Sequence, residues 1–180
     1  MRTVWHFSAQ FSMMKIMNRF LRRLLFAVVL LSAAAASALP SGGDGKDWRV
    51  VVSVADQKTY VYRNSELVRA MVCSTGIQDG DNDTPLGDYI LNESGAKRGE
   101  FFFSEKVGEG GLWWVGFIGG VYLFHSVPVT RDKEIIPEEA ALLGMPASHG
   151  CVRLGMADAR WFYETVPDGA AVHIQLAPNS

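Results

Sequence analysis

Cysteine is scarce in this 180-residue chain, and so is positive charge beyond its first part. Cys73 and Cys151 are the two cysteines, too few for a disulfide-rich scaffold or a cysteine-rich zinc site. Residues 1–38 hold five of the 17 Lys and Arg and no acidic residue, leaving 12 basic against all 19 acidic side chains in the remainder. This acidic excess argues against nucleic acid as a partner, because nucleic-acid binding needs a basic surface.

The chain also lacks internal repeats and low-complexity tracts. A hydrophobic fraction of 48% and a charged fraction of 20% are typical of a globular protein. The length suits one domain and is short for two.

The first residues have the three-part pattern of a secretory signal peptide. A basic flank ending at Arg23 precedes the apolar run 24–31, and Ala36-Ser37-Ala38 is a typical cleavage site. We therefore expect residues 1–38 to be a removed signal peptide, 39–47 a short linker, and the periplasm the destination, with no stable membrane insertion after cleavage. The alternative is an uncleaved N-terminal anchor, because the apolar run extended through the alanines approaches membrane-spanning length.

Short segments with β-branched or alternating residues predict a mostly-β domain over residues 48–177. Strands are predicted at 48–54, 58–63, 67–75, 88–92, 112–117, 121–125 and 172–176. Short helices are predicted at 137–143, where Pro137 suits the first turn, and at 157–165. We expect a β-sandwich or partly open barrel with two or three short helices.

The residues around Cys151 suit a nucleophilic thiol. A neighbouring imidazole such as His149 or a cation such as Arg153 favours the thiolate. Arg153 lies two residues on, which in an extended segment places it on the same face as Cys151. Gly150 lets the backbone approach a substrate and leaves amides available for an oxyanion.

A second candidate, His125, ends a hydrophobic predicted strand and could point into a cleft. Ser126 follows it and could fix one imidazole tautomer through its hydroxyl or its carbonyl. Cys and His together could instead form a zinc site, but the ligand spacing is not that of one. We expect no metal and no cofactor.

Two segments together resemble the signature of the YkuD-type L,D-transpeptidases: Ser148-His149-Gly150-Cys151-Val152-Arg153-Leu154 and Phe124-His125-Ser126. Residues 50–62 resemble the opening hairpin of that family. Residues 74–76 with 84–87 resemble its S-T-G…T-P-x-G segment, and 158–174 its closing helix and strand. The resemblance covers nearly all of 48–176.

The resemblance implies a peptidoglycan acyltransferase. Cys151 would attack the carbonyl of the meso-diaminopimelate–D-alanine bond of a tetrapeptide stem, release D-alanine, and pass the acyl group to an amine of a peptide or protein acceptor. His125 would be the proton donor and acceptor, and Ser126 would orient it. His149 would be a supporting residue rather than the base, and Gly150 would belong to the oxyanion region. Substrate-binding roles would fall to Arg153, Ser148 and Phe124.

Other functions remain open from the residues alone. The same Cys–His site could serve an L,D-carboxypeptidase or another hydrolase, and a non-catalytic wall-binding module is a further alternative. Residues 127–143 form an insertion that we expect at the rim of the cleft, where it could alter acceptor choice. We expect Cys73 to be a buried free thiol, with a bridge to Cys151 as the alternative.

Overall fold

The computed structural model describes residues 45–93 and 97–178. Residues 1–44, which contain the predicted signal peptide, lie outside the described part, so that prediction stays untested. Within residues 45–93 and 97–178, no helix is long and apolar enough to cross a membrane.

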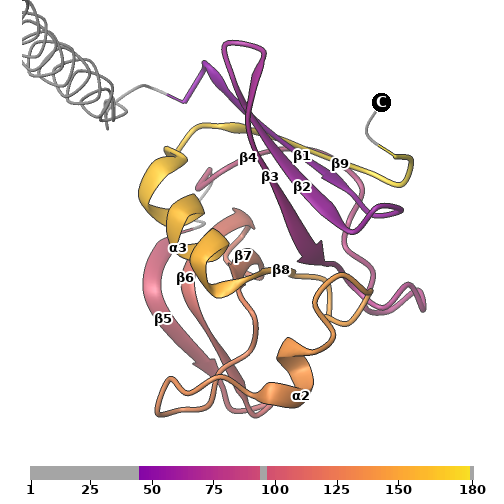
Figure 1. Cartoon of the computed structure of the whole chain (residues 1–180), viewed down its shortest axis with the longest axis vertical. Helices are drawn as coiled ribbons and strands as arrows, with labels where there is room; N and C mark the ends of the chain where they lie inside the picture. Colours follow the sequence, from indigo (N-terminus) through magenta and orange to yellow (C-terminus); the bar gives the residue numbers. More distant parts are fainter. Residues whose placement is uncertain (1–44, 94–96, 179–180) are drawn as a thin grey trace, which may run out of the picture. The chain divides into compact units, whose positions relative to one another are not determined.

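The described residues form nine strands in one curled sheet, with the order β4-β9-β1-β2-β3-β8-β7-β6-β5 (Figure 1). Their bounds are Trp48–Ser53 (β1), Lys58–Arg63 (β2), Glu66–Ser74 (β3), Gly87–Ile90 (β4), Arg98–Ser104 (β5), Glu109–Ile118 (β6), Tyr122–Ser126 (β7), Val152–Leu154 (β8) and Ala171–Gln175 (β9). The β1–β9 and β7–β8 pairs are parallel, and the other neighbours are antiparallel. The predicted mostly-β fold with a partly open sheet is confirmed.

The hairpin between β2 and β3 follows from its turn residues. Asn64 and Ser65 both have positive φ, at 49° and 68°, and a two-residue turn with two such residues matches the twist of antiparallel strands.

The described chain begins with a turn in which the Trp48 amide donates a hydrogen bond to the Gly45 carbonyl. Trp48 is buried at the start of β1.

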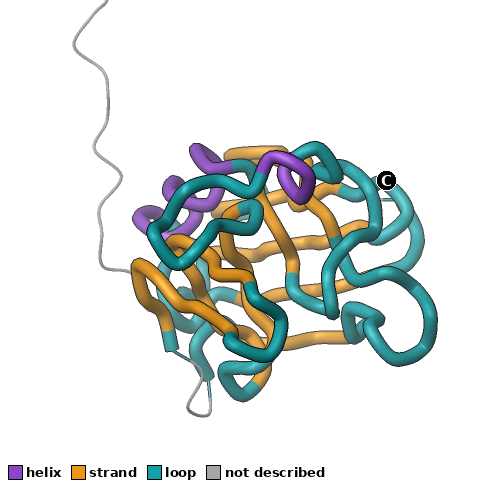
Figure 2. Tube along the Cα trace, turned by 90° about the horizontal axis from the view of Figure 1, so that it is seen from below, coloured by secondary structure: helices purple, strands orange, loops and turns teal. Residues whose placement is uncertain are grey.

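Two helices, Pro137–Ala140 (α2) and Met156–Thr165 (α3), complete the described fold. Figure 2 shows the helices on one side of the strands. The buried face of α3 carries Ala159 and Phe162, and the ring of Phe162 stacks on Phe124 of β7 with centroids 4.7 Å apart. This packing fixes β7, the strand that carries His125.

The helix predicted at 137–143 ends earlier, at Ala140. Beyond it the Ser74 hydroxyl donates to the Leu142 carbonyl at 2.9 Å and accepts from the Gly144 amide at 3.1 Å. Gly144 has φ +99°, a conformation that ends helices. A side chain of β3 thus replaces the hydrogen bonds that another helical turn would have made.

Candidate active site

A cleft of about 380 Å³ opens beside the ends of β6, β7 and β8. Cys151, His125, His149, Ser148 and Arg153 are among its lining residues. The fold therefore brings five of the sequence-predicted site residues to one place, although 26 positions separate His125 from Cys151 in the printed sequence. Their chemical roles stay predictions.

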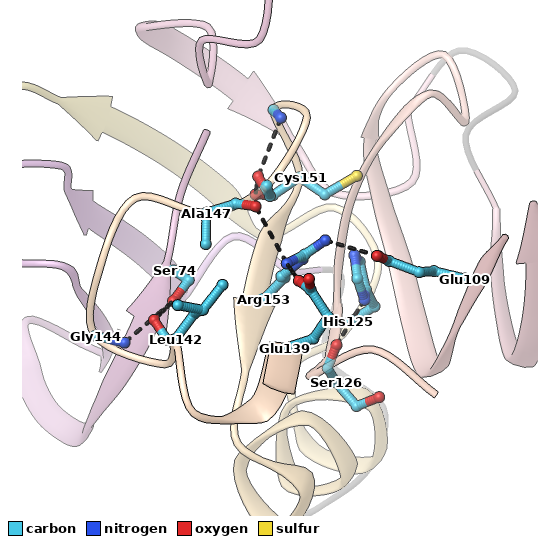
Figure 3. A network of polar contacts seen from close by, with 12 residues as sticks. Ser74, Glu109, His125, Ser126, Glu139, Leu142, Gly144, Ala147, Cys151 and Arg153 are labelled. Carbon is cyan, nitrogen blue, oxygen red and sulfur yellow. Dashed lines mark hydrogen bonds and ion pairs between the residues drawn. The ribbon is translucent and has the colours of Figure 1, made fainter. Parts of the chain in front are cut away.

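His125 is held in one tautomer. Its Nδ1 lies 2.7 Å from the carbonyl oxygen of Ser126, and because a carbonyl only accepts, Nδ1 must carry the hydrogen. In the neutral ring Nε2 is then the proton acceptor. Figure 3 shows the ring edge opposite this hydrogen bond turned toward the side of the cleft that carries Cys151.

His125 and Cys151 are both uncharged in the resting site. Burial, and after it the positive charge of Arg153, lower the pKa of His125 to about 4. Burial raises the pKa of the Cys151 thiol above its ordinary value, although the Leu123 backbone and Arg153 act in the opposite direction. At neutral pH the resting site therefore holds a thiol and a neutral imidazole, the form in which His125 can accept a proton.

Ser126 orients His125 through its backbone carbonyl. Its hydroxyl is used elsewhere, since it accepts from the Leu112 amide at 3.0 Å and donates to the Val127 carbonyl at 2.7 Å. Of the two routes that the sequence left open, the geometry supports the carbonyl.

The loop that carries Cys151 is tied down by the 74–76 and 84–87 segments. The Thr84 hydroxyl accepts from the Gly76 amide and donates to the Gly150 carbonyl, both at 2.9 Å. The Thr75 carbonyl accepts from the Ala147 and Ser148 amides. These contacts hold the Cys151 loop at the edge of the cleft. Thr75 and Thr84 themselves do not line the cleft.

Gly150 and Ser148 support this loop from inside. Gly150 has φ +108°, and a Cβ there would lie 2.6 Å from the Tyr122 ring, so both conformation and space require glycine. Its amide donates to the Ser148 hydroxyl at 3.0 Å, so that amide is not available to an oxyanion. Ser148 in turn donates to the Cys151 carbonyl at 2.5 Å. Being only 1% exposed, Ser148 holds the loop rather than offering its hydroxyl to a substrate.

Two further substrate-binding expectations need correction. Phe124 is 0% exposed, packs in the core against Phe162 and Phe117, and does not reach the cleft. Arg153 lines the cleft, but its side chain is only 5% exposed and both of its Nη atoms are already bound by protein groups. Its Nη1 donates to Glu139 at 2.6 Å and to the Ala147 carbonyl at 3.2 Å, and its Nη2 donates to Glu109 at 2.9 Å (Figure 3).

Three contributors to the site were not predicted from the sequence. Glu109 begins β6 and lines the cleft. Gly111 lies against His125, where a Cβ would approach the ring Nδ1 to 2.5 Å. Glu139 comes from α2, so the 127–143 segment braces Arg153 and does not contribute to the lining of the cleft.

His149 is exposed at the cleft, and Cys73 is a fully buried free thiol. Burial raises the pKa of Cys73 to about 12, so it stays protonated. Among the described residues, no group of three or more His, Cys, Asp or Glu side chains is placed to hold a metal ion.

Comparison with known proteins identifies the class to which this fold and site belong. Residues 47–174 match the family model YkuD, the L,D-transpeptidase catalytic domain. The chain is 42% identical over 142 residues to the Bacillus subtilis protein named "Putative L,D-transpeptidase YciB", covering 75% of this chain and 72% of that protein. The chain therefore belongs to the YkuD L,D-transpeptidase family, which confirms the resemblance.

Solved structures agree on the fold. An L,D-transpeptidase from Mycobacterium smegmatis superposes with a TM-score of 0.58 at 20% identity, covering 72% of this chain and 58% of that one. L,D-transpeptidase 3 from Mycobacterium tuberculosis, solved with a faropenem-derived adduct, superposes with a TM-score of 0.55 at 23% identity, covering 72% and 60%. This chain thus spans less than two thirds of either solved chain.

Proposed function

We propose that the protein is a peptidoglycan L,D-transpeptidase with Cys151 as its nucleophile. Family membership supports the reaction class. The observation that carries the assignment of roles is the His125 Nδ1–Ser126 carbonyl hydrogen bond of 2.7 Å, which leaves Nε2 as a proton acceptor in the cleft that Cys151 also lines.

In the proposed acylation, Nε2 of His125 accepts the Sγ proton as sulfur attacks the carbonyl carbon of the diaminopimelate–D-alanine bond. A C–S bond forms, the C–N bond breaks, and the proton passes from His125 to the departing D-alanine amine. The imidazolium formed on His125 in this way is the acid that protonates the leaving amine.

In the second half, the amine of an acceptor attacks the thioester carbonyl. A C–N bond forms and the C–S bond breaks, while His125 accepts a proton from the attacking amine and returns it to Sγ. Two stem peptides joined in this way give a 3→3 cross-link, and an amine of a protein acceptor gives anchoring.

The proposed substrate lies outside the cytoplasm, so the protein must be exported to reach it. We propose that residues 1–38 direct the protein to the periplasm, where peptidoglycan is assembled. Cleavage after Ala38 would release the domain, and N-terminal sequencing of protein recovered from the periplasmic fraction tests this proposal.

The direct test of the function is incubation with purified disaccharide-tetrapeptide, followed by mass analysis. The parent protein should release D-alanine and form cross-linked dimers, and Cys151→Ala should do neither. Cys73→Ala is the matched control, because it removes the other thiol from a fully buried position. A folded parent protein that neither forms an acyl-enzyme nor turns over the tetrapeptide would refute the proposal.

A faropenem or carbapenem adduct gives a second readout, since a β-lactam carbonyl acylates a suitable thiolate. Intact mass should show one adduct on the parent protein and on Cys73→Ala, and none on Cys151→Ala.

A further inference from the structure

Two carboxylates share one guanidinium in the wall of the cleft. Arg153 binds Glu139 through Nη1 at 2.6 Å and Glu109 through Nη2 at 2.9 Å, with its side chain 5% exposed. With both carboxylates ionised, the three side chains carry one net negative charge. Among the described residues that line the cleft, Arg153 is the single Lys or Arg, so no other Lys or Arg side chain of that described lining offsets the excess charge.

The excess negative charge faces the cleft at Glu109. Glu109 lines the cleft and Glu139 does not. The hydrogen bond to Arg153 uses Oε2 of Glu109, and within the described residues Oε1 of Glu109 makes no hydrogen bond and is not buried. This oxygen can therefore accept a hydrogen bond from a molecule in the cleft.

Arg153 and His149 act on Glu109 in the same direction. Burial raises the pKa of Glu109 above its ordinary value and the neighbouring Glu139 charge adds to this, while the charges of Arg153 and His149 lower it. Arg153 thus serves both to hold the Glu109 carboxylate in place and to favour its ionised form, in a cleft wall shared with Cys151.

We propose that Glu109 binds the acceptor of the transfer reaction as an ammonium ion, through the open carboxylate oxygen Oε1. This inference rests on the proposed function, and it names the acceptor class as a primary amine that enters the cleft positively charged. A charge-assisted hydrogen bond of this kind is about twice as strong as a neutral one. It holds the nitrogen beside the Cys151 acyl-enzyme until reaction.

The bound ammonium loses one proton to solvent, and its nitrogen attacks the thioester carbonyl carbon. The new C–N bond replaces the C–S bond, and His125 transfers the second proton of the nitrogen to Sγ of Cys151. Glu109 is ionised before and after, so it is a binding residue and takes no part in the proton transfer.

The experiment compares Glu109→Gln with Glu139→Gln, because both variants remove one carboxylate from the same guanidinium. The acyl-enzyme is offered two nucleophiles. The first is a diaminopimelate-containing tripeptide, whose side-chain amine is an ammonium at neutral pH, and the second is hydroxylamine, which is uncharged. Glu109→Gln should raise the KM for the tripeptide about tenfold or more and change the hydroxylamine reaction by less than about twofold. Glu139→Gln should affect both nucleophiles alike, because it acts through Arg153.

Glu109→Asp keeps the charge and should recover part of the tripeptide affinity. Equal effects of Glu109→Gln on the two nucleophiles, or equal tripeptide KM values in Glu109→Gln and Glu139→Gln, would overturn the assignment while leaving the transpeptidase proposal intact. A parent protein that forms no acyl-enzyme would overturn both.

Discussion

Gly111→Ala should disable the site by displacing His125. A Cβ at residue 111 would lie 2.5 Å from Nδ1 of His125 and 2.7 Å from the Phe102 ring. Ordinary contact between such atoms is about 3.5 Å, so the imidazole must move by about 1 Å. The Nδ1 hydrogen bond to the Ser126 carbonyl, now 2.7 Å long, cannot survive that shift in its present geometry.

The size of the effect follows from this displacement. A misplacement of about 1 Å costs on the order of 100-fold in rate, which is about 2.7 kcal/mol of transition-state stabilisation. The extra methyl group also overpacks the core, at about 1–3 kcal/mol of folding stability. We expect kcat/KM for acylation by a carbapenem to fall about 100-fold, in a protein that still unfolds cooperatively at a lower Tm.

The assay is stopped-flow or mass-detected acylation, with circular dichroism to show that the variant is folded. Gly155→Ala is the matched control, because Gly155 has φ −58° and the nearest heavy atom to its added Cβ is 3.5 Å away. It should react at the parental rate. A folded Gly111→Ala that also acylates at the parental rate would show that His125 is not the proton acceptor, or that its position is not critical.

Three further predictions concern His125, Thr84 and Ser126. Acylation should keep its acid limb near pH 4, because His125 becomes protonated as pH falls through its pKa of about 4; a limb at pH 6–7 in the pH–rate profile would contradict the buried neutral imidazole. Thr84→Val removes both hydrogen bonds of that hydroxyl, including the one to the Gly150 carbonyl, and chemical denaturation should show a loss of about 2–3 kcal/mol. Ser126→Ala leaves the orienting carbonyl in place, so acylation kinetics should change by less than about tenfold while denaturation shows a loss of about 1 kcal/mol; a loss of activity as large as that of Cys151→Ala would assign the orienting role to the hydroxyl.

Most of the sheet could be predicted from local patterns, and two strands could not. β5 contains Phe101-Phe102-Phe103, which lacks the alternation that marks a half-buried strand. β8 has three residues, too few for any periodicity. It is a strand because β3 and β7 flank it on both sides, a long-range condition that the local sequence does not contain.

Some residues of the candidate site could likewise be predicted from local spacing, and others could not. Cys151 and Arg153 share a face because side chains two apart in an extended segment do so, and both line the cleft. The same rule places Phe124 on the face opposite His125, which is why the prediction for Phe124 is wrong. Glu109 and Glu139 reach Arg153 from 44 and 14 positions away, and no spacing rule links residues so far apart.

The protonated state of Cys151 bears on how the proposed nucleophile of an exported domain would resist oxidation. Oxidation of cysteine follows thiolate character and exposure. Burial raises the pKa of Cys151, so the resting thiol is a poor target. In the proposed mechanism, His125 generates the thiolate only as the substrate carbonyl is attacked. A preformed thiolate–imidazolium pair would react faster with every electrophile, oxidants included. The neutral pair therefore links the buried imidazole, with its pKa of about 4, to the proposed export: both favour a nucleophile that is activated in the cleft and by the substrate.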